Sequence, residues 1–176
     1  GHYQRAEAKA GQTPIEVYAA QGVENNLELA NKVMVAMPSG EPHPGEVTVG
    51  VMSMPGPSPS QQAREVADRV KAGLESLTAE LGPYPYDSLV LSQMPGRMSQ
   101  GWPGLIFLSS YSFLTSEELA RSKIAGPDAV LYSTLMPIHE AAHQWWGDLV
   151  SWKSYRDQWL VEALANYCAL AAMEKS

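Results

Sequence analysis

The run His139-Glu140-Ala141-Ala142-His143, with Glu162 further along the chain, decides how this sequence is interpreted. On a helix, the pattern H-E-x-x-H places two imidazoles four residues apart on one face, where both can reach a single zinc ion. Glu140 lies beside that face, where its carboxylate can act on a water molecule rather than bind the metal. The run therefore predicts a zinc helix with His139 and His143 as ligands and with Glu140 within reach of a zinc-bound water.

A catalytic zinc ion typically takes three protein ligands and leaves a fourth position for water, so the motif requires one more ligand. Glu162 is the best candidate, because it follows His143 by nineteen positions (162 − 143) within a second segment of apolar periodicity. The alternative is a chance match of the pattern on a buried core helix. We therefore expect a zinc site made of His139, His143 and Glu162.

Composition indicates one compact domain. The chain has 176 residues, 45% of them hydrophobic, which is enough for a core of its own. The net charge of −7, without a run of lysine or arginine, argues against nucleic acid or an anionic membrane as the main partner. No apolar stretch approaches the roughly 18 residues of a membrane span. A single cysteine, Cys168, excludes an internal disulfide and is expected to be buried. These features do not indicate the cellular compartment of the protein.

Sequence periodicity predicts strands before the motif and helices around it. Alternating or apolar runs indicate five strands, at residues 15–19, 32–37, 46–52, 88–93 and 104–109, with a loop at 38–45. A long helix should begin at Ser58 as N-cap, with Pro59 in its first position and Gln61 completing a capping box, and end at Gly82.

Three further helices are expected in the second half of the chain. Thr115 opens a short one through a capping box, which continues to about residue 123. The zinc helix should begin near Ser133 or Thr134, with Pro137 in its first turn, and should end at Gly147. The last helix should start between residues 154 and 157 and continue to the end of the chain.

Two stretches carry a family resemblance. His139-Glu140-Ala141-Ala142-His143-Gln144-Trp145-Trp146-Gly147-Asp148, followed by Asp157-Gln158-Trp159-Leu160-Val161-Glu162-Ala163-Leu164-Ala165-Asn166-Tyr167, resembles the aminopeptidase N family of gluzincin metallopeptidases. That family reads H-E-x-x-H-Q-W-x-G-(N/D), then W-L-N-E-G-x-A-x-Y, with the same gap of eighteen residues (144–161). The upstream run Gly82-Pro83-Tyr84-Pro85-Tyr86-Asp87 looks like the family's Y-P-x-x-K/D-L stretch.

The resemblance implies an α+β, thermolysin-like zincin subdomain, with a mixed β-sheet packed on helices and the zinc helix at the floor of a cleft. It implies Zn²⁺ bound by His139, His143 and Glu162, with Glu140 as general base and a peptide or protein as substrate. It also implies that residues 1–176 form a single metallopeptidase domain of a longer chain, truncated before a helical subdomain. The family's transition-state tyrosine belongs to that subdomain.

The chain departs from the family pattern where the substrate amine is held. The family has G-x-M-E-N, whose glutamate grips the free amine, whereas Ser99 and Gln100 stand at the acid and amide positions here. A neutral side chain offers a hydrogen bond without the charge, so the sequence predicts a weak preference for free N-termini. Ala169 also replaces an acid that the family carries seven residues after the zinc glutamate.

Other side chains could orient the ligand imidazoles in place of that acid. Asn166 follows Glu162 by one helical turn, and Asp157 lies in the turn before it, although Asp157 fits an N-cap role equally well. Asp148 is a third possibility. Three tryptophans near the motif, Trp145, Trp146 and Trp159, are expected to pack in the core.

Three functions remain open at this point. The first is a zinc peptidase, exo- or endo-acting, that uses Glu140. The second is a zinc-binding but catalytically silent module for peptide or partner binding, which the missing amine anchor would favour. The third is a structural domain without metal, against which the full H-E-x-x-H…E set argues.

Overall fold

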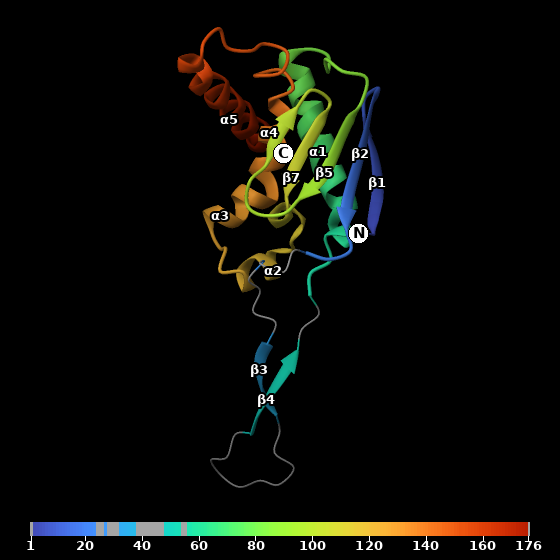
Figure 1. Cartoon of the computed structure of the whole chain (residues 1–176), viewed down its shortest axis with the longest axis vertical. Helices are drawn as coiled ribbons and strands as arrows, with labels where there is room; N and C mark the ends of the chain where they lie inside the picture. Colours follow the sequence, from blue (N-terminus) through green and yellow to red (C-terminus); the bar gives the residue numbers. More distant parts are fainter. Residues whose placement is uncertain (1, 24–26, 28–31, 38–47, 54–55, 176) are drawn as a thin grey trace.

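The structure is a computed structural model that describes residues 2–23, 27, 32–37, 48–53 and 56–175. Its centre is a five-stranded mixed sheet in the order β1-β2-β5-β7-β6 (Figure 1). The strands are β1 (Tyr3–Ala10), β2 (Thr13–Ala20), β5 (Leu89–Met94), β6 (Gln100–Trp102) and β7 (Leu105–Ser109). The predicted α+β class, with a mixed sheet packed on helices, is confirmed.

Strand pairing places β6 at one edge of the sheet. β2, β5 and β7 run parallel to one another, while β1 and β6 pair antiparallel at the two edges. The predictions missed β1 and β6. β1 is exposed along most of its length and β6 has only three residues, so neither shows an apolar alternation that could be recognised.

A second, two-stranded sheet consists of β3 (Lys32–Met37) and β4 (Thr48–Ser53), which pair antiparallel. These strands match the predicted ones at 32–37 and 46–52 within two residues. The loop predicted at 38–45 lies outside the described residues. In Figure 1 this hairpin extends away from the five-stranded sheet.

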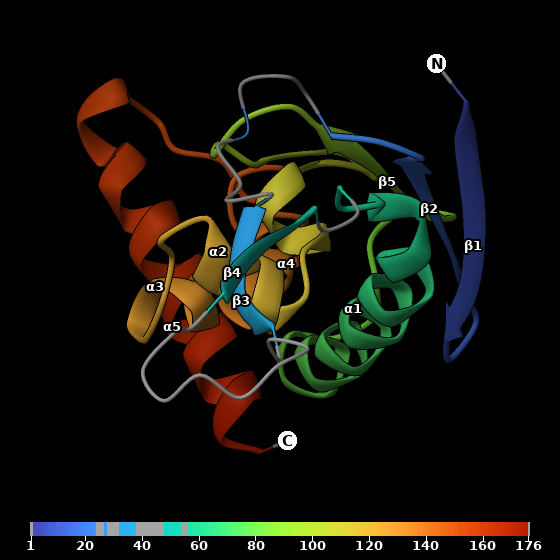
Figure 2. The same ribbon diagram turned by 90° about the horizontal axis from the view of Figure 1, so that it is seen from below.

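The long helix α1 (Pro59–Leu81) covers the sheet (Figure 2). Its buried face carries Val66, Val70, Leu74 and Leu77, at the spacing that predicted it. Gly82 ends the helix with φ +96°, as expected of a glycine stop. The predicted capping box is wrong, because the Ser58 side chain makes no cap bond and its hydroxyl instead lies 3.1 Å from that of Ser60.

The zinc helix begins earlier than predicted. A continuous helical run starts at α3 (Pro127–Val130), passes through the π-helical turn η2 (Leu131–Leu135) and continues as α4 (Met136–Ala142). Pro137 lies in the first turn of α4 but well inside the run. Because proline lacks the N–H of a regular turn, a wide turn just before it accommodates the residue. The regular helix also ends at Ala142, before Gly147.

Helix α4 packs closely on α1. A Cβ atom at Gly73 of α1 would lie 2.8 Å from Cγ1 of Ile138 on α4, so only glycine permits this approach. α5 (Gln158–Glu174) follows the short turn η3 (Tyr155–Asp157) and packs against α4. It begins one residue after the predicted range of 154–157, and Cys168 on its inner face is buried as expected. The sheet and α1 therefore hold α4, and α4 holds α5.

The remaining short elements follow the sheet. The 3₁₀ turn η1 (Ser110–Phe113) leads from β7 to α2 (Ser116–Arg121). The capping box predicted at Thr115 is confirmed, with Glu118 as its partner, and Lys123 stops the helix in the left-handed region at φ 60°. Among the residues described, no helix combines the length and the hydropathy that a membrane span requires.

Candidate active site

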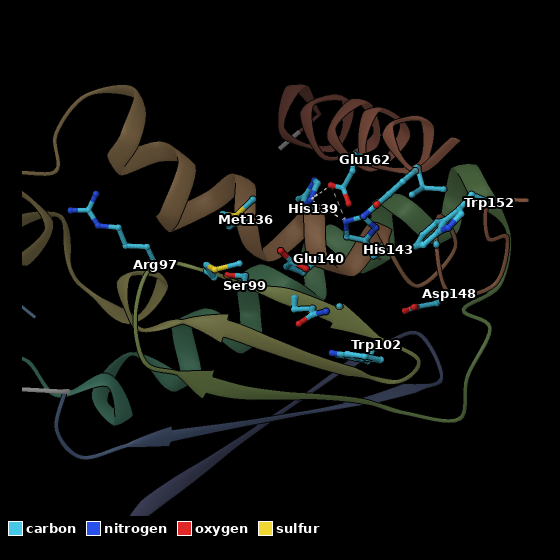
Figure 3. A pocket seen from close by; sticks show the side chains of 16 residues that line it. Arg97, Ser99, Trp102, Met136, His139, Glu140, His143, Asp148, Trp152 and Glu162 are labelled. Carbon is cyan, nitrogen blue, oxygen red and sulfur yellow. Dashed lines mark hydrogen bonds and ion pairs between the residues drawn. The ribbon is translucent and has the colours of Figure 1, made fainter. Parts of the chain in front are cut away.

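Three predicted ligand side chains converge between α4 and α5 (Figure 3). Glu162 Oε2 lies 3.6 Å from Nε2 of both His139 and His143, and those two ring nitrogens are 3.1 Å apart. His143 sits at the C-cap of α4 but keeps the helical hydrogen bond to His139 O, so the spacing of four residues still places both rings on one face. The three side chains can therefore hold one metal ion.

The hydrogen bond of His143 fixes which nitrogen faces the other two side chains. His143 Nδ1 lies 2.8 Å from the carbonyl oxygen of Trp146, and a carbonyl can only accept, so Nδ1 carries the proton. In the neutral ring, Nε2 then presents its lone pair to His139 and Glu162. Lone pairs and a carboxylate this close repel one another unless a proton or a cation lies among them. The donor set therefore fits a metal ion.

His139 is the more deeply buried of the two histidines. Burial, and then the charge of His143, lower its pKa to about 4, so the ring is neutral near pH 7 and able to bind a metal. The Asn166 side chain on α5 acts in the opposite direction and favours the protonated ring. Within the described residues, however, Nδ1 of His139 is buried without a hydrogen-bond partner of normal geometry. Of the three side chains considered for orienting a ligand, Asn166 is thus the one near His139.

Glu140 is buried beside the ligands, with 4% of its surface exposed. Burial, and then the charge of Glu162, raise its pKa to about 8, whereas a hydrogen bond from the backbone N–H of Gly101 lowers it. A carboxyl group poised near neutral pH is suited to taking up and releasing a proton. Nearby positive charge would favour its ionised form.

These side chains line a cavity of about 580 Å³ between the helices and the edge strand β6. Glu140 and the two histidines come from α4, and Glu162 comes from α5. The opposite side is formed by residues 97–102, none of which is acidic. We call the first side the helical wall and residues 97–102 the strand wall.

Gly101 permits the close approach of the two walls. A Cβ atom at this position would lie 3.0 Å from Cβ of His143 and 3.1 Å from the carbonyl oxygen of Glu140. Any other residue would push the edge strand away from the metal-ligand group. No local sequence pattern indicates this requirement, because it arises from the packing of segments about forty residues apart.

The buried side chain of Gln144 connects the two walls by hydrogen bonds. This role was not predicted from the sequence. Gln144 Oε1 accepts hydrogen bonds from the Tyr84 hydroxyl at 3.0 Å and from Gly104 N at 2.8 Å. Its Nε2 donates to Trp102 O at 2.9 Å and to Asp148 Oδ2 at 3.1 Å. The side chain is fully buried with both polar atoms paired, so it fixes the strand wall relative to α4.

The other side chains that were expected to orient the imidazoles or to pack beside the motif lie in different surroundings. Asp148 accepts from Gln144, as described, and burial raises its pKa. Asp157 stands at the N-cap position of α5, but its side chain makes no cap bond and instead accepts a hydrogen bond from the Ser154 hydroxyl at 2.8 Å. Trp145 is in the core and Trp146 packs against it, as expected. The prediction for Trp159 is wrong, because 67% of its surface is exposed.

Comparison with known proteins places the site within a family. Residues 86–176, just over half of the chain, match the Peptidase family M1 domain. Over 97 residues the chain is 32% identical to probable aminopeptidase 1 of Sulfurisphaera tokodaii, covering 53% of this chain and 11% of that protein. It is 35% identical over 94 residues to human endoplasmic reticulum aminopeptidase 2, covering 51% of this chain and 9% of that protein. The chain thus spans only a small part of these relatives.

Solved structures agree on the fold. An M1 zinc metallopeptidase from Deinococcus radiodurans matches 99% of this chain and 28% of its own, with a TM-score of 0.52 and 20% identity. A variant of that enzyme bound to a Tyr-Ser-Ala substrate matches equally, at a TM-score of 0.52. At this level of identity the similarity concerns the arrangement of the backbone.

Proposed function

Because the chain belongs to peptidase family M1, we propose that it is the catalytic part of a zinc metallopeptidase whose active site is the cavity between the two walls. The observation that carries the proposal is the convergence of His139, His143 and Glu162 beside the buried carboxyl group of Glu140. A peptide or protein is the proposed substrate. The M1 structure that carries a Tyr-Ser-Ala peptide supports that class.

Zinc suits the donor set. Two neutral imidazoles and one carboxylate are a ligand combination typical of catalytic zinc, and they leave one position open. The lone pair that His143 Nε2 presents, and the low pKa of His139, both fit metal binding. Zinc, when bound, supplies a Lewis acid that polarises a carbonyl group and makes water more acidic. Glu162, half-exposed on α5, completes the set, with its Oε2 at 3.6 Å from Nε2 of each ring.

Glu140 is the proposed general base. Its carboxylate takes a proton from the attacking water and passes it to the leaving amine as the peptide bond breaks. The hydrogen bond from Gly101 N–H orients the carboxyl group and favours its ionised form. Burial keeps the pKa high enough for the same group to return the proton.

We also propose a thermolysin-like arrangement, in which α4 forms the floor of the substrate cleft. Residues 1–176 then form one metallopeptidase domain within a longer protein, and a helical subdomain supplies the transition-state tyrosine. Two observations support this: the relatives are several times longer, and α5 exposes a row of large apolar side chains. That row comprises Trp159, Leu160, Tyr167 and Leu170. A face of this kind is suited to packing against further protein.

Substrate preference should differ from that of an aminopeptidase with an acidic amine anchor. Ser99, at the position of the anchoring acid, accepts a hydrogen bond from Ser109 N at 3.0 Å and so serves the sheet. Gln100 is exposed and neutral. Nothing on the strand wall can pair with a substrate ammonium, so we expect little dependence on a free N-terminus.

Removal and return of zinc test the proposal. The full-length protein that contains this domain should hydrolyse unstructured peptides, lose that activity after dialysis against a chelator, and regain it with one equivalent of zinc. Zinc binding without any hydrolysis would instead support a silent peptide-binding module. Hydrolysis that survives complete metal removal would contradict the proposed chemistry.

A further inference from the structure

The strand wall carries one feature that the proposed chemistry does not use, the side chain of Arg97. It is the single lysine or arginine among the described residues that line the cavity. The acids of the cavity are Glu140, Asp148 and Glu162. In Figure 3, Arg97 lies on the opposite side of the metal-ligand group from Asp148 and Trp152. The cavity therefore has an acidic region and one separate cation.

The guanidinium of Arg97 lies over the ring of Tyr111, which in turn packs against the ring of Tyr132. The guanidinium carbon atom lies 5.4 Å from the centroid of the Tyr111 ring, which is itself buried, and the Tyr132 ring lies 5.1 Å from Tyr111. A guanidinium stacked on an aromatic face keeps the donors on its edge available to a planar acceptor. The contact with Tyr111 restricts the exposed Arg97 side chain before any ligand arrives, which lowers the entropic cost of binding.

Among the residues that the structure describes, no carboxylate pairs with Arg97. No described acid lies within ion-pair distance of Arg97, unlike Arg5, Arg64 and Arg69, each of which has such a partner. Asp128, beside the tyrosines, acts on Arg97 only from a greater distance. The guanidinium remains able to accept a carboxylate from another molecule, for which its fork geometry is well suited.

We propose that Arg97 is a specificity-determining residue that binds a carboxylate of the peptide substrate, from an acidic side chain or from the C-terminus. This inference rests on the proposed function, since it assigns a subsite of the same cavity. The chain would then select substrates by a negative charge at the Arg97 end of the cleft, in place of a positive charge held by an acidic anchor.

Peptide binding to the zinc-loaded protein tests the proposal, with Glu140→Gln used to prevent turnover. One set consists of alanine hexapeptides with a single Glu or Gln at each position in turn, and a second compares the C-terminal acid with the amide. Because Arg97 is exposed, we expect about fivefold tighter binding of the charged member in one of the two sets, and a weaker preference at high salt. The set that responds identifies the source of the carboxylate.

Variants distinguish a binding preference caused by Arg97 from one caused by the overall charge of the protein. Arg97→Ala should abolish the preference, and Arg97→Lys should retain part of it because the charge remains. Arg64→Ala, which removes an exposed arginine on α1 away from the cavity, should leave it unchanged. If the protein that keeps Arg97 binds the charged and neutral peptides equally well, the proposal is overturned. It is also overturned if Arg97→Ala still prefers the charged peptides.

Turnover by the full-length protein that contains this domain, with Glu140 and Arg97 intact, keeps the two proposals distinguishable. If zinc-loaded protein hydrolyses the neutral and the charged peptides alike, the peptidase assignment holds and the role of Arg97 is contradicted. If it hydrolyses none of them, the peptidase assignment fails. The binding ratios still decide whether Arg97 selects a carboxylate.

Discussion

The two walls of the cavity differ in how far they keep the chemistry of the family. The helical wall brings His139, His143, Glu162 and Glu140 together at the spacing of the family motif. The strand wall, at residues 97–102, has no acidic side chain and adds an arginine. In the function proposed here, the reaction depends on the first wall and the choice of substrate on the second. A chain can therefore keep the groups for peptide hydrolysis while changing what it accepts.

The largest expected effect concerns the helical wall. Glu140→Gln keeps the shape of the side chain and removes the proton acceptor, so kcat should fall by roughly 10²-fold or more. Zinc content should stay at the level of the parent, because Glu140 is not a proposed ligand. Steady-state hydrolysis together with elemental analysis checks both points. Unchanged turnover in this variant would remove Glu140 from the mechanism.

A second prediction concerns the connection between the walls. Gln144→Ala deprives Gly104 N, Trp102 O and the Tyr84 hydroxyl of their buried partner, and should lower the free energy of unfolding by about 2 kcal/mol. Denaturant titration measures this loss. Gln158→Ala is the matched control, since this half-buried glutamine also lines the cavity. An equal effect of both changes would contradict the role of Gln144.

The smallest expected effect concerns the strand wall. Removing one partner of a buried charge pair usually costs several kcal/mol, and this wall has no acid to form such a pair with an ammonium. The ratio of kcat/KM for matched peptides with free and acetylated N-termini should therefore stay below about tenfold. A ratio of about a hundredfold or more would show that an amine anchor exists and that another residue supplies it.

Sequence reasoning succeeded where the signal is local in the chain. H-E-x-x-H depends on helical spacing alone, and Gly82 and the Thr115 capping box depend on a few neighbouring residues. It failed where a feature depends on packing between segments that are far apart in the chain. The buried side chain of Gln144 and the close approach at Gly101 arise only when β6 packs on α4. The early start of the zinc helix was missed because a π-helical turn carries the helix through Pro137.

Zinc stoichiometry tests the central claim most directly. Protein prepared without chelators should contain about one zinc ion per chain, as expected for a single three-ligand site. His143→Ala should lose most of it under the same conditions, while Gln158→Ala should keep it. If His143→Ala retains as much zinc as the parent protein, His139, His143 and Glu162 do not form the metal site, and the proposed function loses its basis.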